Sequence, residues 1–372
     1  MRRALPQRLR LIARLAVAAF SAGFLLVMLW GWSGLYSVAA SRGHWPPVEW
    51  FLTYVMRNSV KTHAFGIDPP QLKSRQLILL GAGHFHSECA SCHGAPGFPP
   101  GVAAQQMLPL PPDLGDASTQ WRDRELFWII KNGLKYTGMP AWPSLERDDE
   151  VWAVVAFLKE LPSLNATQYR ELALGGLQVP PRSGREIANF GSVEEAIGAC
   201  ARCHGMEDRR PPSDRVPVLH GQSADFLIAA LQSYADGTRQ SGIMQPVARP
   251  LSAAAVQRLA EYYASLKAPR TADVKPDLAQ IKRGEEIAIA GVTEAQVPPC
   301  LACHDRNALA TFPRLAAQNA EYMVAKLQLW KNDLAPRTGN AEIMAPIARR
   351  LSDQQIADLS AYFAALQAER ER

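Results

Sequence analysis

Three short runs of cysteine and histidine are the residues of this chain whose types and spacing could do chemistry. Each has the form Cys-x-x-Cys-His, and together they use all six cysteines. Two cysteines on one helical turn point to the same side and can form thioethers with the vinyl groups of a haem. The histidine that follows is then placed beneath the iron, a pattern typical of c-type haem attachment. The sequence therefore predicts three covalent haem c groups, attached through Cys89, Cys92, Cys200, Cys203, Cys300 and Cys303 and ligated by His93, His204 and His304.

Two other uses of paired cysteines agree less well with the sequence. Zinc sites use four tetrahedral ligands, usually from two pairs that converge, whereas these pairs lie about 100 residues apart, each in its own segment. A thioredoxin-like redox pair needs a βαβ context, and the sequence has few strand signals. Haem attachment is therefore the preferred interpretation.

The second axial ligand of each iron has candidates among the methionines. Methionine opposite histidine raises the reduction potential of a haem. Met244 and Met344 each follow their histidine by 40 residues and precede a proline by two. The first segment offers two candidates, Met107 and Met139.

A helical template decides between these two candidates. Apolar residues stand 12, 15, 19 and 22 positions after Met139, Met244 and Met344, and this spacing makes one helix face. The same count from Met107 meets a threonine and an arginine. We therefore expect Met139, Met244 and Met344 to be the ligands and Met107 to line the site. The predicted face comprises Val151, Val154, Leu158 and Leu161, then Val256, Leu259, Tyr263 and Leu266, then Ile356, Leu359, Phe363 and Leu366.

Other histidines and prolines near the motifs have supporting roles. His220 has Ala316 as its counterpart in the repeat, so we expect it to be structural or solvent-facing. Pro217 and Pro313 correspond to each other, and their carbonyls could accept the Nδ1–H of the proximal histidine and fix its ring. Three prolines compete for this role in the first segment: Pro109, Pro111 and Pro112.

The last two segments are copies of one another. When the chain is shifted by 100 residues, 11 of the 24 positions in 243–266 match 343–366. This indicates a duplicated domain of about 90 residues, with the first segment a more distant relative. The patterned runs 125–132, 224–236 and 320–332 have the 3.6-residue period of helices, so we expect an all-α fold.

The predicted organisation is a row of three units behind an N-terminal segment. Residues 162–181 and 268–276 read as linkers, and 49–63 as an amphipathic helix that acts as a spacer near the membrane surface. The predicted boundaries are 1–40 for the cytoplasmic arginines and anchor, 41–74 for the connector, and 75–163, 181–268 and 279–369 for the three domains.

Charge is concentrated at the N-terminus. Residues 1–40 hold five arginines and no acidic residue, which leaves a body with 35 basic and 35 acidic residues. A neutral body argues against a nucleic-acid-binding protein, which normally has a basic face.

The N-terminal segment can also cross a bilayer. Residues 15–41 are 27 residues without a charge, more than the roughly 20 that span the hydrocarbon core. The arginines should stay cytoplasmic, which predicts a single-pass anchor in a bacterial inner membrane with the rest of the chain periplasmic. A signal peptide cleaved near Ala40 is the alternative, but the apolar run is longer than a typical signal core.

With these motifs, each unit resembles a class I cytochrome c domain. Residues 181–369 are similar to the tandem dihaem periplasmic cytochromes c, through Leu219-His220-Gly221-Gln222 and the stretch from Met244 to Leu266. Residues 75–163 resemble single-haem domains with a Gly-Met-Pro-Ala-Trp ligand loop, here Gly138 to Trp142. The resemblance implies three class I cytochrome c domains in tandem after one transmembrane helix.

The function that this resemblance implies is electron transfer. We expect a membrane-anchored carrier between a donor, either a dehydrogenase or a quinol-oxidising complex, and an acceptor, either an oxidase or a soluble cytochrome. The alternatives are a dedicated cytochrome subunit of a periplasmic dehydrogenase or terminal oxidase, and a haem enzyme with one open iron. Membrane lipid contacts the N-terminal helix in each case, and no catalytic residue is predicted because all three sites have a methionine candidate.

Overall fold

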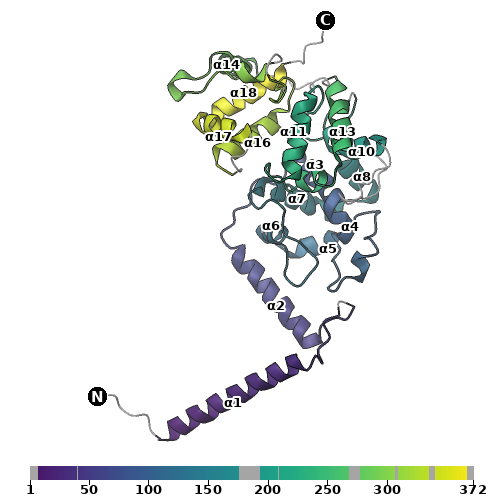
Figure 1. Ribbon diagram of the computed structural model, residues 1–372, viewed down its shortest axis with the longest axis vertical. Helices are drawn as coiled ribbons and strands as arrows, with labels where there is room; N and C mark the ends of the chain where they lie inside the picture. The colour runs from purple at the N-terminus through teal and green to yellow at the C-terminus, as the bar shows by residue number, and fades with distance from the viewer. Residues whose placement is uncertain are drawn as a thin grey trace, which may run out of the picture.

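The computed structural model describes residues 7–39, 41–175, 193–207, 209–267, 277–305, 309–334 and 340–366. Within these ranges the chain forms helices and three isolated β-bridges, and no strand. The expectation of an all-α fold is confirmed. Figure 1 shows a long first helix, a second helix leading from it, and a group of shorter helices that make up the rest of the molecule.

The helices fall into a leading pair and three helical units. The leading helices are α1 (Gln7–Trp32) and α2 (Pro46–His63). The first unit contains α3 (Arg75–His84), η1 (Phe85–Cys89), α4 (Ala90–His93), η2 (Ala104–Gln106), α5 (Leu114–Ala117), η3 (Ser118–Gln120), α6 (Asp123–Asn132), α7 (Asp148–Glu160), η4 (Leu161–Ser163) and α8 (Ala166–Leu174). The second contains α10 (Val193–His204), α11 (Ala224–Ala235), α12 (Met244–Ala248) and α13 (Ala253–Ser265). The third contains α14 (Leu278–Ala290), η5 (Thr293–Ala295), α15 (Leu301–His304), α16 (Ala320–Lys331), α17 (Asn340–Arg350) and α18 (Asp353–Ala365).

In the first and third units the core is built where the opening helix crosses the closing helix. A Cβ atom on Gly81 of α3 would lie 2.0 Å from the carbonyl oxygen of Ala153 in α7. On Gly284 of α14 it would lie 2.1 Å from that of Asp358 in α18. Only glycine allows the two backbones to approach so closely. The corresponding glycine of the second unit, Gly184, lies outside the described residues.

The first unit extends further than the sequence indicated. Residues 166–174 were expected to lie in a linker, and this expectation was wrong. They form α8, whose N-terminus is capped by the Asn165 side chain and whose Tyr169 and Leu174 are fully buried against the core. The helix is short and follows Pro162, so its periodicity is too brief to separate it from a linker by pattern.

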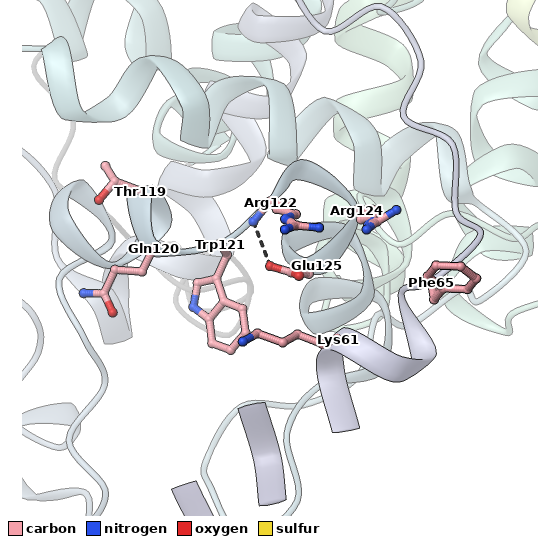
Figure 2. A pocket seen from close by; sticks show the side chains of 8 residues that line it. All are labelled: Lys61, Phe65, Thr119, Gln120, Trp121, Arg122, Arg124 and Glu125. Atoms are coloured by element: carbon pink, nitrogen blue, oxygen red, sulfur yellow. Dashed lines mark hydrogen bonds between the residues drawn. The ribbon is translucent and has the colours of Figure 1, made fainter. Parts of the chain in front are cut away.

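The connector helix α2 is docked on the first unit at its C-terminal end. Val60 and Ala64 are fully buried, and the Arg57 guanidinium donates to Gln120 (3.2 Å) and lies 5.4 Å from the Trp121 ring centre. The contact leaves an open cavity of about 590 Å³, into which Figure 2 shows the Lys61 side chain extending beside Trp121. The connector is therefore attached to the first unit, and is more than a spacer.

The repeated units share an unusual backbone position. Gly221 has φ of 69° and donates its N–H to the Tyr263 carbonyl (3.0 Å), while its counterpart Ala317 has φ of 60° and donates to Phe363 (2.9 Å). Both residues are left-handed, a conformation that strains any residue with a Cβ. The two loops therefore have the same geometry although the residues differ.

Substitutions at Gly221 and Ala317 should change the free energy of unfolding in opposite directions. Ala317→Gly should stabilise the third unit and Gly221→Ala should destabilise the second, each by roughly 0.5–1 kcal/mol. Backbone strain of ~1–2 kcal/mol is partly offset by the entropy of the unfolded chain. A Cβ on Gly221 has room, since its nearest neighbour would be 3.5 Å away. Local hydrogen exchange in α13 and α18 measures both effects, and shifts of the same sign would contradict the explanation.

Candidate haem-binding sites

The six cysteines stand on short helical segments. Cys89 ends η1 and precedes α4, Cys200 and Cys203 lie in the last turn of α10, and Cys300 precedes α15. None is in a disulfide. Burial raises the pKa of the Cys89 and Cys200 thiols to about 12 and that of Cys300 to about 11.

The histidine of each motif is held by a proline carbonyl. Nδ1 lies 2.8 Å from the Pro112 oxygen for His93, 3.1 Å from Pro217 for His204, and 3.0 Å from Pro313 for His304. A carbonyl only accepts, so Nδ1 carries the proton and the Nε2 lone pair is free to bind a metal. The expected acceptors Pro217 and Pro313 are confirmed, and Pro112 takes the role left open in the first segment.

Burial keeps these imidazoles neutral. It lowers the pKa of His93 and His304 and lowers that of His204 to about 4. A neutral ring with a fixed tautomer is the form in which histidine binds metals. All three motifs therefore present the same electronic state of the side chain.

The predicted methionine ligands lie in segments just ahead of the closing helices. Met139 lies between α6 and α7 and packs on the core of the first unit, Met244 begins α12, and Met344 lies within α17. All three side chains are half-buried. Met107 lies next to the residue before Met139, with its sulfur 3.0 Å from where a Cβ on Gly138 would stand. This position agrees with a lining role.

The helix face predicted from these methionines is buried in all three units. The first three residues of each set are at most 8% exposed. The last residue is buried in the first unit (Leu161) and half-buried in the others, as Leu266 and Leu366. The template that selected Met139 therefore describes a real shared feature of the fold.

The remaining histidines near the motifs are structural. His220 is 4% exposed and its ring packs edge-on to Tyr263 (6.0 Å), so it is buried and not solvent-facing. His86 is fully buried and its Nδ1 lies 2.9 Å from the Tyr169 hydroxyl. In the part of the chain that the structure describes, no group of three His, Cys, Asp or Glu side chains could hold a separate metal ion.

The surroundings also fit a haem. The buried donors Trp142 Nε1 and Arg202 Nε have no partner within the described protein. Buried donors are normally paired, and a haem propionate is an anionic acceptor of suitable chemistry. The residues present thus supply thioether-forming cysteines, an oriented histidine, a thioether side chain and anion-binding donors.

The second and third units meet through a reciprocal pair of glutamines that sequence reasoning missed. Gln318 accepts from the Val218 N–H (2.7 Å) and donates to its carbonyl (3.1 Å). Gln222 does the same to Arg314 (2.9 and 2.7 Å). The two glutamines are repeat partners, so the interface has pseudo-twofold symmetry. Each clamped residue directly follows a proline that holds a proximal histidine.

The first and second units also contact each other near a motif. Ser213 Oγ donates to the Gln76 carbonyl (2.8 Å), and Arg202 donates to Ser87. A Cβ on Gly83 of α3 would lie 3.3 Å from Cys203 Sγ. The second motif is therefore packed against the opening helix of the first unit.

Comparisons with known proteins show that the chain is similar to cytochromes c. The family model "Cytochrome C oxidase, cbb3-type, subunit III" matches residues 77–158. A thiosulfate dehydrogenase electron acceptor of Stutzerimonas stutzeri is 31% identical over 191 residues, which are 50% of this chain and 88% of that protein. A cytochrome c4 of Thiocapsa roseopersicina is 35% identical over 195 residues, 50% of this chain and 92% of that protein. A solved cytochrome c4 of Acidithiobacillus ferrooxidans is 34% identical, with a TM-score of 0.41 over 45% of this chain and 98% of that one.

The chain belongs to the cytochrome c family. It is an electron-transfer protein with tandem cytochrome c domains, and haem c, bound covalently, is the cofactor of this family. The resemblance inferred from the sequence is thereby confirmed.

The glutamine clamp yields a test of the interface. Gln318→Ala should leave the N–H and carbonyl of Val218 buried without partners, at a cost of about 2 kcal/mol. The amides of residues 216 and 218–220 should then exchange hydrogen roughly 30-fold faster in the full-length holoprotein. Gln257→Ala, which removes an exposed amide paired with Glu261, is the control. Unchanged exchange in Gln318→Ala would show that the clamp does not hold the units together.

Proposed function

We propose that the chain is a membrane-anchored periplasmic protein that carries electrons along three haem c groups. The ligands would be His93 with Met139, His204 with Met244, and His304 with Met344. The observation that carries the proposal is the threefold recurrence of a histidine oriented by a proline carbonyl ahead of a methionine and a buried helix face.

The protein's own residues would do three things. The proline carbonyls would orient the histidine rings so that Nε2 can bind the iron, and the methionine segments would supply a thioether, which favours the reduced state. The helix crossings of the first and third units would exclude water. The haem supplies the one-electron chemistry when bound. Because the second unit contacts both others, electrons would pass through it. The three domains would follow the three helical units, with the first extended to Leu174.

The N-terminal segment supports attachment to the inner membrane. The stretch Arg10–Trp32 within α1 is apolar enough to span a bilayer, with a mean hydropathy of 2.2. Beyond it, Trp45, Trp50 and Tyr54 are all more than half exposed, and such rings favour the membrane–water interface. The five arginines among the first 14 residues favour a cytoplasmic N-terminus and periplasmic haem domains.

The partners would be redox proteins. One relative is named as the electron acceptor of a thiosulfate dehydrogenase, which favours a periplasmic dehydrogenase as donor, with an oxidase or soluble cytochrome as acceptor. The family model that matches the first unit is named after an oxidase subunit, which favours permanent membership of an oxidase as the second candidate. Copurification from detergent separates the two.

Intact mass tests the cofactor count and the anchor together. Protein extracted from carbonate-washed membranes should have the mass of the chain with its anchor plus three haems, because each motif forms two thioethers. A mass that corresponds to a chain starting at Ser41 would show a cleaved signal peptide. Two haems or fewer, in cells with working haem attachment, would contradict the count.

The assignment of Met139 has a matched control within the same unit. Met139→Ala should remove about a third of the near-infrared sulfur-to-iron band and lower one reduction potential, since a thioether raises it. It should also open one iron to carbon monoxide. Met107→Ala should do none of these because Met107 lines the site. Loss of the band in Met107→Ala would reverse the assignment, and carbon monoxide binding by the wild type would favour a haem enzyme.

A further inference from the structure

The segment of the first unit that follows Met139 is hydrogen-bonded to the segment of the second unit that precedes Met244. Ser144 Oγ donates to Gln240 Oε1 (2.9 Å), and the Arg147 guanidinium donates to the Gln240 carbonyl (3.0 Å). Both interactions join residues more than 90 positions apart in the chain. The two predicted methionine ligands are therefore linked by protein contacts across the unit boundary.

Glu150, at the start of α7, is the centre of this contact. Its side chain is 4% exposed, and Arg147 neutralises it at 2.8 Å. Oε1 accepts from the Ser241 hydroxyl and Oε2 accepts from the Gly242 N–H, both at 2.6 Å. A buried carboxylate needs such paired charge and donors, and here both donors come from the other unit.

The contact continues to the backbone of Met244. Ser241 Oγ donates to Glu150 and accepts from the Met244 N–H (3.1 Å). The carboxylate fixes the orientation of this hydroxyl, which in turn fixes the first residue of α12. A single hydroxyl thus connects a carboxylate of the first unit to the residue proposed as an axial ligand in the second.

Close packing at Gly242 further stabilises the contact between the first and second units. A Cβ at Gly242 would lie 2.0 Å from Trp142 Nε1, so the indole lies directly against this backbone. The repeat partners of Ser241 and Gly242 in the third unit are Ala341 and Glu342. Alanine has no hydroxyl to form the relay. The glutamate side chain would leave no room for an indole packed as Trp142 is packed on Gly242. The third unit therefore cannot form this relay.

We propose that Glu150 of the first unit is a positioning residue for the Met244 thioether, so that docking of the first unit sets the axial ligation and reduction potential of the second haem. This inference rests on the proposed ligation by Met244. Hydrogen bonds to a charged group contribute about 1.5–3 kcal/mol, so loss of this hold should raise the population of the detached methionine roughly 10- to 100-fold.

The test uses the full-length holoprotein in detergent. Glu150→Gln replaces one acceptor oxygen by a donor, and Ser241→Ala removes the hydroxyl relay while leaving Glu150 and Arg147 in place. Both variants should bind cyanide at one haem at least about tenfold faster than wild type, weaken the near-infrared sulfur-to-iron band and lower one of the reduction potentials. Ser241→Thr, which keeps the hydroxyl, should restore wild-type behaviour.

Two further variants separate positioning from stability and from ligation itself. Asp358→Asn removes another buried carboxylate, paired with Arg283 in the third unit, and should change stability without changing cyanide binding at any haem. Met244→Ala should open the same haem fully, and adding Glu150→Gln to it should have no further effect. Wild-type cyanide binding in both Glu150→Gln and Ser241→Ala, with Met244→Ala open, would overturn this proposal alone. A closed haem in Met244→Ala would overturn the ligation on which it rests.

Discussion

The hydrogen bond from a histidine Nδ1 to a proline carbonyl is the interaction on which the rest of the structure depends. It occurs three times, at Pro112, Pro217 and Pro313. The bond fixes which ring nitrogen carries the proton and forces the chain after each motif to return beneath its histidine. The path to the methionine and the closing helix then follows from that return.

The same returning segments also join the units. Val218 and Arg314, which follow two of these prolines, are clamped by Gln318 and Gln222 of the opposite unit. A shift of one unit would therefore move the peptide that orients a histidine in the other. The same backbone segments therefore join the two units and orient the histidines.

The contact between the first and second units differs from the glutamine interface. It is asymmetric, and it acts on the methionine side through Glu150 and Ser241. The glutamine interface acts on the histidine side and is reciprocal. In the proposed ligation the second unit would be held by its neighbours on both axial sides, so its haem would respond most to changes in unit packing.

Sequence reasoning recovered the features that depend on local spacing. The motifs, the repeat and the buried faces of the closing helices all follow from fixed offsets along the chain. The faces end at Leu161, Leu266 and Leu366. It missed α8, which is too short for its period to stand out beside Pro162. It also missed Glu150 and Gln318, because contacts between units depend on three-dimensional placement and have no period. A shift of 96 residues relating Gln222 to Gln318 was the one signal that could have found the clamp.

We propose that each of the three irons has one histidine and one methionine ligand in the assembled protein. Near-infrared magnetic circular dichroism of the oxidised full-length protein, calibrated per haem, tests it most directly. With three histidine–methionine centres, all of the haem should be low-spin and the sulfur-to-iron band should have the intensity of three such centres. A high-spin fraction, or a band shifted to the position of two nitrogen ligands at any haem, would contradict it.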